Sequence, residues 1–178
     1  MVHFLNKNGT KIAAHLVLSK SGQKASPVAL FSHALYGSKQ DTIDSLIGQR
    51  LSEEGISSLY IDFSGHGASG GRIDENIVAQ QREDLESACD FLCAQPEIDI
   101  NRIGLSGSSF GSRAAIQMAA HNLRVKALVL RAPVIELSIT PEVQHISANT
   151  MILVGENDRW FSAGKCSLKD FSAPKNLS

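Results

Sequence analysis

The sequence has little excess charge, few cysteines and no long apolar run. Its 178 residues carry 17 Lys and Arg against 18 Asp and Glu, which gives a net charge of -1. This balance gives no electrostatic reason to expect nucleic acid or an anionic membrane as a partner. No apolar run approaches the length of a membrane span, and the first nine residues show no secretory signal. We therefore expect a cytoplasmic protein.

Cysteine is also scarce. The chain has three cysteines, an odd number without the spacing of metal ligands. Two of them, Cys89 and Cys93, lie four residues apart on an expected helix, and we expect reduced thiols with no metal or cofactor role. Hydrophobic residues make up 43% of the chain, enough for the core of one domain over residues 1–178.

Residues 101–120 carry the clearest functional signal. An apolar run, Ile103 to Leu105, predicts a strand, and apolar side chains between 114 and 119 recur at helical spacing. The corner between them reads Gly-Ser-Ser-Phe-Gly and fits the Gly-x-Ser-x-Gly nucleophile elbow, with Ser109 as the nucleophile. The backbone N–H of Phe110 would then stabilise a developing oxyanion. The plain alternative is an ordinary Gly/Ser turn in a parallel sheet.

Strand and helix patterns alternate along the chain, which predicts an α/β fold with a mostly parallel sheet. An Asn-Gly pair joins the first two strands and predicts an antiparallel hairpin at the N-terminus. The expected strands are 2–5, 11–18, 28–32, 56–63, 103–105, 125–130 and 150–154. The expected helices include one that begins at Asp41 or Thr42 and ends at Gly55, with Ile43, Leu46, Ile47 and Leu51 inward, and one over 74–94.

With the elbow, the strands and the helices in this order, the chain resembles the α/β-hydrolase superfamily, close to its small lidless esterases and dienelactone-hydrolase-like members. The resemblance implies a three-layer fold with helices on both faces of a twisted sheet. In many relatives a helical lid follows the strand at 125–130. Here only residues 134–149 separate it from the next strand, too few for a packed lid, and we expect an open site.

The resemblance also implies further site residues. The loop after the strand at 28–32 begins His33-Ala34-Leu35, and the family places its second oxyanion N–H at the position of Leu35. Alanine stands at 34 where glycine is usual, which makes this assignment depend on the backbone conformation there. His33 would brace the loop. Asp158 matches the triad acid in a Gly-x-x-Asp frame after the last strand, with a turn aspartate as the plain alternative.

A second glycine pattern allows another interpretation. Gly65, Gly67 and Gly70 fit the dinucleotide fingerprint after a strand. In that fingerprint the glycines open a helix directly, whereas the next helical pattern starts only near residue 74. We expect no nucleotide here, and His66 is interpreted as a loop histidine near the mouth of the site.

A histidine after the acid is lacking. In this superfamily the triad follows the order Ser, acid, His, but all six histidines (3, 15, 33, 66, 121 and 145) precede Asp158. An eighth strand is lacking as well. Three accounts fit: a C-terminally shortened hydrolase whose serine is not activated, a substitute base at His66 or His145, or a second chain that supplies the histidine or pairs with the exposed sheet edge as a homodimer.

The sequence therefore predicts a serine hydrolase of the carboxylic-ester type. Acyl transfer to water would proceed through an acyl-serine on Ser109, with a small-molecule ester or thioester as substrate. The alternative from another class is a non-catalytic, hydrolase-like binding or interaction protein.

Overall fold

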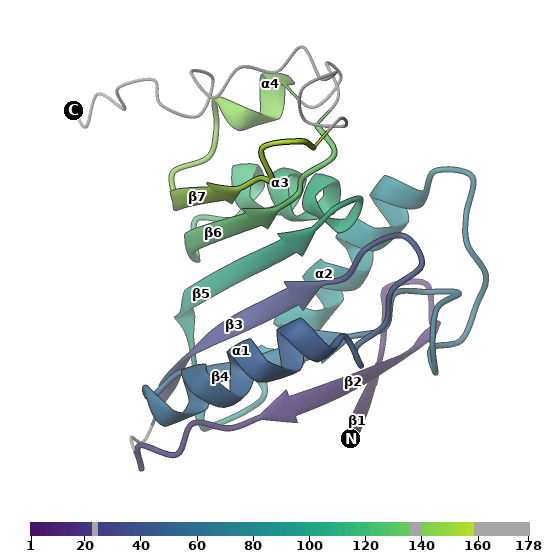
Figure 1. The fold of residues 1–178 in the computed structure, drawn as a ribbon. Helices are drawn as coiled ribbons and strands as arrows, with labels where there is room; N and C mark the ends of the chain where they lie inside the picture. The colour runs from purple at the N-terminus through teal and green to yellow at the C-terminus, as the bar shows by residue number, and fades with distance from the viewer. Residues whose placement is uncertain (23–24, 136–139, 159–178) are drawn as a thin grey trace.

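The sheet is the framework on which the predicted site is built. A computed structural model describes residues 1–22, 25–135 and 140–158. In this part of the chain the sheet has seven strands in the order β1-β2-β4-β3-β5-β6-β7 (Figure 1). The strands are β1 (Val2–Leu5), β2 (Lys11–Val17), β3 (Ser26–Ser32), β4 (Ser57–Ile61), β5 (Ile98–Ser108), β6 (Val125–Arg131) and β7 (Asn149–Leu153).

The pairing confirms the predicted mixture of parallel and antiparallel strands. β1 pairs with β2, and β2 with β4, in antiparallel register, whereas β3, β4, β5, β6 and β7 are parallel to one another. Every residue of β4 is buried, as expected for a parallel strand covered on both faces. The carboxyl ends of β3, β5 and β6 therefore meet at one edge of the sheet, where ligands of open α/β sheets bind.

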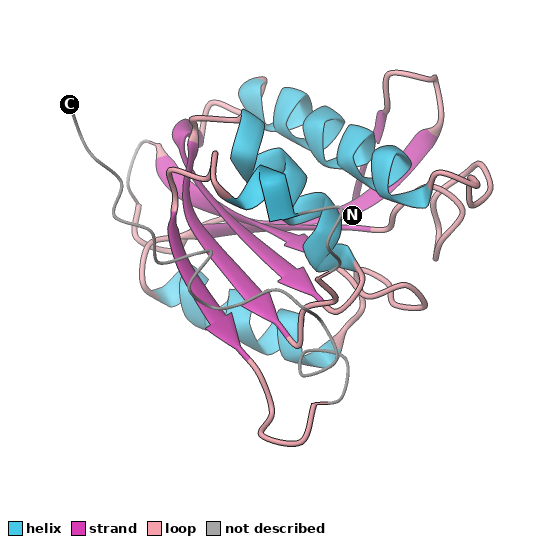
Figure 2. Cartoon of the chain, turned by 90° about the horizontal axis from the view of Figure 1, so that it is seen from above, coloured by secondary structure: helices cyan, strands magenta, loops and turns pink. Residues whose placement is uncertain are grey.

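Helices cover both faces of the sheet, so the chain forms the predicted three layers. α1 (Thr42–Glu53) lies on one face, and α2 (Ile77–Cys93) and α3 (Gly111–His121) lie on the other (Figure 2). The short α4 (Thr140–Val143) follows β6. Asp41 caps α1, because its carboxylate accepts hydrogen bonds from the backbone N–H groups of Ile43 and Asp44. In the described part of the chain no helix is long and apolar enough to cross a membrane.

Most predicted boundaries differ from the structure by a few residues, and for two of them the hydrogen bonding gives the reason. β5 begins at Ile98 and not at Ile103, because Ile98 pairs with Ser26 of β3. α2 begins at Ile77 and not near residue 74. Before it, the Asp74 carboxylate accepts the Asn76 N–H at 2.7 Å and folds this segment into a turn.

The predicted inward face of α1 is wrong for Ile43 and Leu46. Its fully buried residues are Asp44, Gly48 and Ser52, whereas Ile43 and Leu46 are 59% and 61% exposed. The cause is the side chain of Tyr60 on β4. A Cβ at Gly48 would lie 1.3 Å from the Tyr60 hydroxyl, so only glycine lets the helix settle on this ring.

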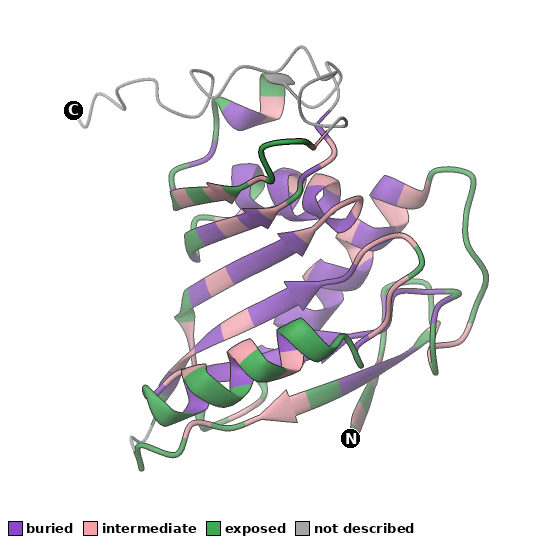
Figure 3. Ribbon diagram, in the orientation of Figure 1, coloured by how far each residue is buried: buried purple, intermediate pink, exposed green. Residues whose placement is uncertain are grey.

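On the face of the sheet that carries α1, the described residues leave part of the outer strands uncovered. Ile47 and Leu51 of α1 line a groove of about 530 Å³ there, together with apolar residues of the sheet that include Phe31, Val129 and Leu153. Figure 3 shows the exposed positions along β7, the last strand of the sheet, where Leu153 is 50% exposed. Pairing of this edge with a second copy stays a prediction.

Candidate active site

Ser109 occupies a strained corner between β5 and α3. Its φ is +48°, and only Ala132 shares a positive φ among the described non-glycine residues. The corner is fixed by backbone hydrogen bonds: the Ser109 N–H donates to Arg131 O at 2.9 Å, and the Ser112 N–H donates to Ser109 O at 3.1 Å. The Ser112 hydroxyl donates to the same carbonyl oxygen at 2.5 Å. Backbone strain of this kind persists where the surroundings enforce it, commonly at functional sites.

The two glycines of the motif allow this corner to form. A Cβ at Gly107 would lie 2.7 Å from the Ser112 Cα, inside the first turn of α3. A Cβ at Gly111 would lie 2.3 Å from His33 O and 2.7 Å from Ser32 O. Strand, helix and the end of β3 therefore approach one another more closely than any side chain allows.

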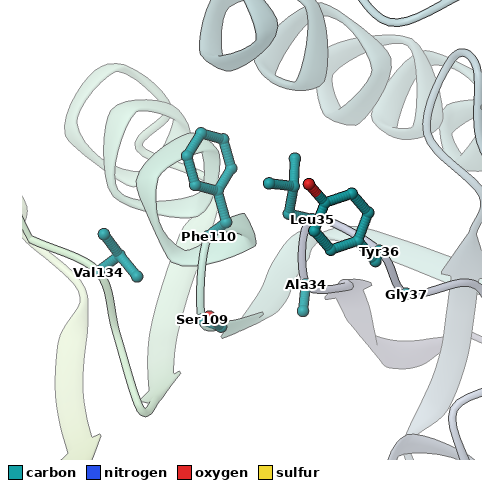
Figure 4. Close-up of a pocket in the computed structure, with 7 residues that line it drawn as sticks. All are labelled: Ala34, Leu35, Tyr36, Gly37, Ser109, Phe110 and Val134. Carbon is teal, nitrogen blue, oxygen red and sulfur yellow. The ribbon is translucent and has the colours of Figure 1, made fainter. Parts of the chain in front are cut away.

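The corner opens into a cavity of about 630 Å³ (Figure 4). The cavity brings together three of the residues predicted from the sequence, Ser109, Phe110 and Leu35. Ala34, Tyr36, Gly37 and Val134 complete the described lining. The sequence did not single out Tyr36 or Val134 as site residues; both lie in loops whose course depends on tertiary contacts. Tyr36 is 92% exposed, which places its ring at the open side of the cavity.

His33 holds the loop that carries Leu35. The Phe63 N–H donates to His33 Nε2 at 3.1 Å, so the proton of the neutral ring lies on Nδ1 and is donated to Ala34 O at 2.6 Å. Burial lowers the pKa of His33, although the bond to Ala34 opposes this effect. The ring is therefore neutral and braces the loop. Ala34 does not have a positive φ, so alanine fits this position without strain that a glycine would relieve.

A buried ion pair holds the far end of the same loop. The Lys39 ammonium pairs with the Asp62 carboxylate, with side chains 6% and 0% exposed, and the Lys39 N–H donates to Asp62 at 2.6 Å. The Ala68 N–H donates to the other carboxylate oxygen at 2.8 Å. Burial raises the pKa of Asp62, but these hydrogen bonds and the Lys39 charge outweigh it, and the pKa is lowered. A Cβ at Gly67 would lie 2.3 Å from this carboxylate, so the central glycine of the supposed dinucleotide fingerprint makes room for Asp62.

His66 and His145, the two candidates for a substitute base, lie in different surroundings. Both ring nitrogens of His66 face backbone carbonyl oxygens, Ser64 O at 3.0 Å and Leu35 O at 2.5 Å. Both ring nitrogens therefore contact loop backbone, and neither is left to accept the proton of the Ser109 hydroxyl. His145 is exposed beyond α4, outside the lining of the cavity.

Asp158 lies in the turn that follows β7. Its backbone N–H donates to Gly155 O at 3.0 Å, and the residue is half-buried. It is not among the described residues that line the cavity. Its role as the triad acid stays a prediction. In the described ranges no group of three or more His, Cys, Asp or Glu side chains is placed to hold a metal ion.

The chain matches one family model and several known proteins. The model of the serine aminopeptidase S33 family matches residues 23–156. The thiohydrolase aneE of Aspergillus aculeatus is 30% identical over 143 residues, which are 80% of this chain and 44% of that protein. The polyketide transferase grgF of a Penicillium species is 33% identical over 115 residues, 64% of this chain and 39% of that protein.

Solved structures show the same fold. The structure of the α/β hydrolase GrgF matches with a TM-score of 0.68 and 28% identity, over 80% of this chain and 48% of that one. The dienelactone hydrolase of Anabaena variabilis matches with a TM-score of 0.71 and 23% identity, over 87% of this chain and 72% of that one. The chain spans less than half the length of the two curated relatives.

Proposed function

Because this chain belongs to the serine aminopeptidase S33 family of α/β hydrolases, we propose that it is built for acyl transfer from a carboxylic ester or thioester through an acyl-serine on Ser109. The observation that carries this proposal is the strained φ of +48° at Ser109, in the same cavity as the backbone of Phe110 and Leu35. One relative is named a thiohydrolase, and for this reason thioesters stand beside oxygen esters as candidate substrates.

The proposed chemistry follows from this geometry. The Ser109 oxygen attacks the acyl carbon, the carbonyl oxygen becomes an oxyanion, and the N–H groups of Phe110 and Leu35 stabilise it. Collapse expels the alcohol or thiol, which takes a proton, and water then releases the acid. The cavity lining of Leu35, Tyr36, Phe110 and Val134 favours an apolar acyl group, because no charged side chain lines the described cavity.

The hydroxyl of Ser109 needs a base, and neither His33 nor His66 supplies one. His33 and His66 use both ring nitrogens in hydrogen bonds to the backbone. We assign to Asp158 the role of orienting a catalytic imidazole. That imidazole comes from a source other than His33 and His66. Because the ring nitrogens of both histidines are occupied in this way, a second candidate function is also favoured. It is that of a hydrolase-like protein that binds a ligand in the cavity without turnover.

Labelling with a fluorophosphonate, with and without added free imidazole, separates the two functions. We expect mass spectrometry to find the adduct on Ser109, and we expect imidazole to increase both labelling and the hydrolysis of p-nitrophenyl acetate or an acetyl thioester. Ser109→Ala should abolish labelling and lower the hydrolysis to the rate that imidazole gives without the protein, and Ser108→Ala, the matched neighbour, should keep both signals. Absence of any Ser109 adduct at saturating imidazole would overturn the hydrolase proposal and leave the binding function.

A further inference from the structure

Ala132 is the second described residue, besides Ser109, that has a positive φ without being glycine. It follows β6 directly, and its φ is +43°, against +48° at Ser109. Hydrogen bonds connect the two strained positions. The Ser109 N–H donates to Arg131 O at 2.9 Å, and the Val134 N–H donates to Ser109 O at 3.3 Å. The segment 131–134 therefore bonds to both backbone polar groups of Ser109.

Pro133 explains why the backbone bends at this point. Ser108 pairs with Arg131 in the parallel register of β5 and β6, so continued pairing would place Ser109 opposite Ala132. In a parallel pair, a residue donates to the residue before its partner and accepts from the residue after it. The residue after Ala132 is Pro133, which has no N–H to donate. A straight continuation of β6 would therefore leave the Ser109 carbonyl group without a donor from this strand.

We propose that Ala132 is a positioning residue for Ser109. Its strained backbone turns the chain out of the direction of β6 and brings the Val134 N–H to Ser109 O, one residue after the N–H that the proline lacks. The side chain of Ala132 is exposed and does not line the described cavity. Its effect on Ser109 therefore passes through the backbone. A positive φ is costly for an L-residue and persists where surrounding contacts enforce it.

Further contacts of the same segment hold this conformation and connect it to the rest of the site. The Ala132 N–H donates to Leu153 O at 2.8 Å, at the end of β7. Val134 lines the cavity together with Ser109 (Figure 4). The segment therefore joins the corner at Ser109, one wall of the cavity and the strand that precedes the turn of Asp158. The hold on Ser109 is independent of catalysis, whereas its effect on acyl transfer rests on the proposed function.

Hydrogen exchange of the full chain, followed by NMR, tests this hold without reference to activity. Valine is poorly tolerated at a positive φ, whereas asparagine adopts it readily. In Ala132→Val we expect the Ser109 and Val134 amides to exchange about tenfold faster, because the strain of the segment increases. The amide of Leu105, which is paired on both sides in the middle of β5, should keep its rate. Ala132→Asn should keep all three rates.

The matched control is Ala127→Val, the same change at an exposed position of β6 without a positive φ. It should keep the exchange rate of the Ser109 amide. If Ala132→Val does not fold, Ala132→Leu takes its place, since a bulky side chain is also disfavoured at a positive φ. A Ser109 amide that exchanges at the wild-type rate in this variant, or faster in Ala132→Asn, would overturn the proposal.

A labelling experiment separates this inference from the proposed function. If Ser109 labels with the fluorophosphonate, its rate at saturating imidazole should fall about tenfold in Ala132→Val and recover in Ala132→Asn. Ala127→Val should label at the wild-type rate. If wild-type Ser109 does not label, the proposed function fails, and hydrogen exchange still decides whether Ala132 holds the corner. Faster exchange in Ala132→Val with unchanged labelling would overturn the positioning role, because Ala132 would then stabilise the fold alone.

Discussion

At the scale of single residues, Ser109 combines a reactive position with an unfavourable backbone. An L-residue at a φ of +48° costs about 1–2 kcal/mol relative to glycine. We therefore expect Ser109→Gly to raise the free energy of unfolding by about 0.5–1 kcal/mol, after the greater flexibility of glycine in the unfolded chain is subtracted. The same change should remove all labelling of the site. Urea unfolding, followed by circular dichroism, measures the first effect.

The neighbouring serine provides the control for this prediction. Ser108 ends β5 and does not have a positive φ. Ser108→Gly should therefore lower the free energy of unfolding by about 0.5–1 kcal/mol. Equal losses of stability in both variants would show that the corner at Ser109 is not strained.

The site residues differ in how far a sequence can predict them. Ser109, Phe110 and Leu35 were predicted because each lies in, or next to, a short motif, and the cavity brings them together. The pairing of Lys39 with Asp62 joins residues 23 positions apart, and no local pattern encodes it. The two unequal histidine environments could not be predicted for the same reason, since each depends on which backbone groups the folded loops present.

At the scale of elements, the closest approach in the site is that of α3 to the end of β3. Gly111 begins α3, and a Cβ there would lie 2.3 Å from His33 O. We expect Gly111→Ala to push α3 away from the 33–39 loop, to lower the free energy of unfolding by about 3 kcal/mol, and to abolish Ser109 labelling. Gly104→Ala is the matched control inside β5. The nearest atom to its new methyl group would be 4.0 Å away, so labelling should persist.

The elements themselves were largely predictable, with one instructive exception. Alternating strand and helix patterns gave the right order, because hydrophobic period is a local property. The predicted inward face of α1 was wrong for Ile43 and Leu46, because the apolar stripe is turned partly away from the sheet. Tyr60 takes the space at Gly48, and Asp44 is buried beside Arg131, with which it forms an ion pair. A tertiary contact, not the periodicity, therefore decides how this helix is turned.

At the scale of the whole molecule, the ion pair between Asp44 and Arg131 couples stability to pH. It joins α1 to the end of β6, the strand whose Arg131 O also holds the Ser109 N–H. Burial raises the pKa of Asp44 from 3.8 to about 6, although the positive charge of Arg131 opposes this effect. The folded state therefore binds this proton more tightly than the unfolded state does.

The sign of the pH dependence follows from this shift. Because the pKa of Asp44 is higher in the folded state, its contribution should lower the free energy of unfolding as the pH rises from about 4 to about 6. The change should be of the order of 2 kcal/mol. The lowered pKa of His33 acts in the opposite direction over part of this range. For this reason the measurement is the difference between wild type and Asp44→Asn, which does not titrate, in urea unfolding at pH 4 to 7.

A surface ion pair supplies the matched control for this difference. The exposed pair of Asp99 and Arg102 lowers the pKa of Asp99, which is the opposite direction to the shift of Asp44. Asp99→Asn should therefore keep the fall in stability that wild type shows between pH 4 and 6, whatever its absolute stability, whereas Asp44→Asn should lose it. If Asp44→Asn also runs parallel to wild type, the Asp44 carboxylate ionises in the folded protein as it does in the unfolded chain. Burial at the α1–β6 contact would then not govern its proton.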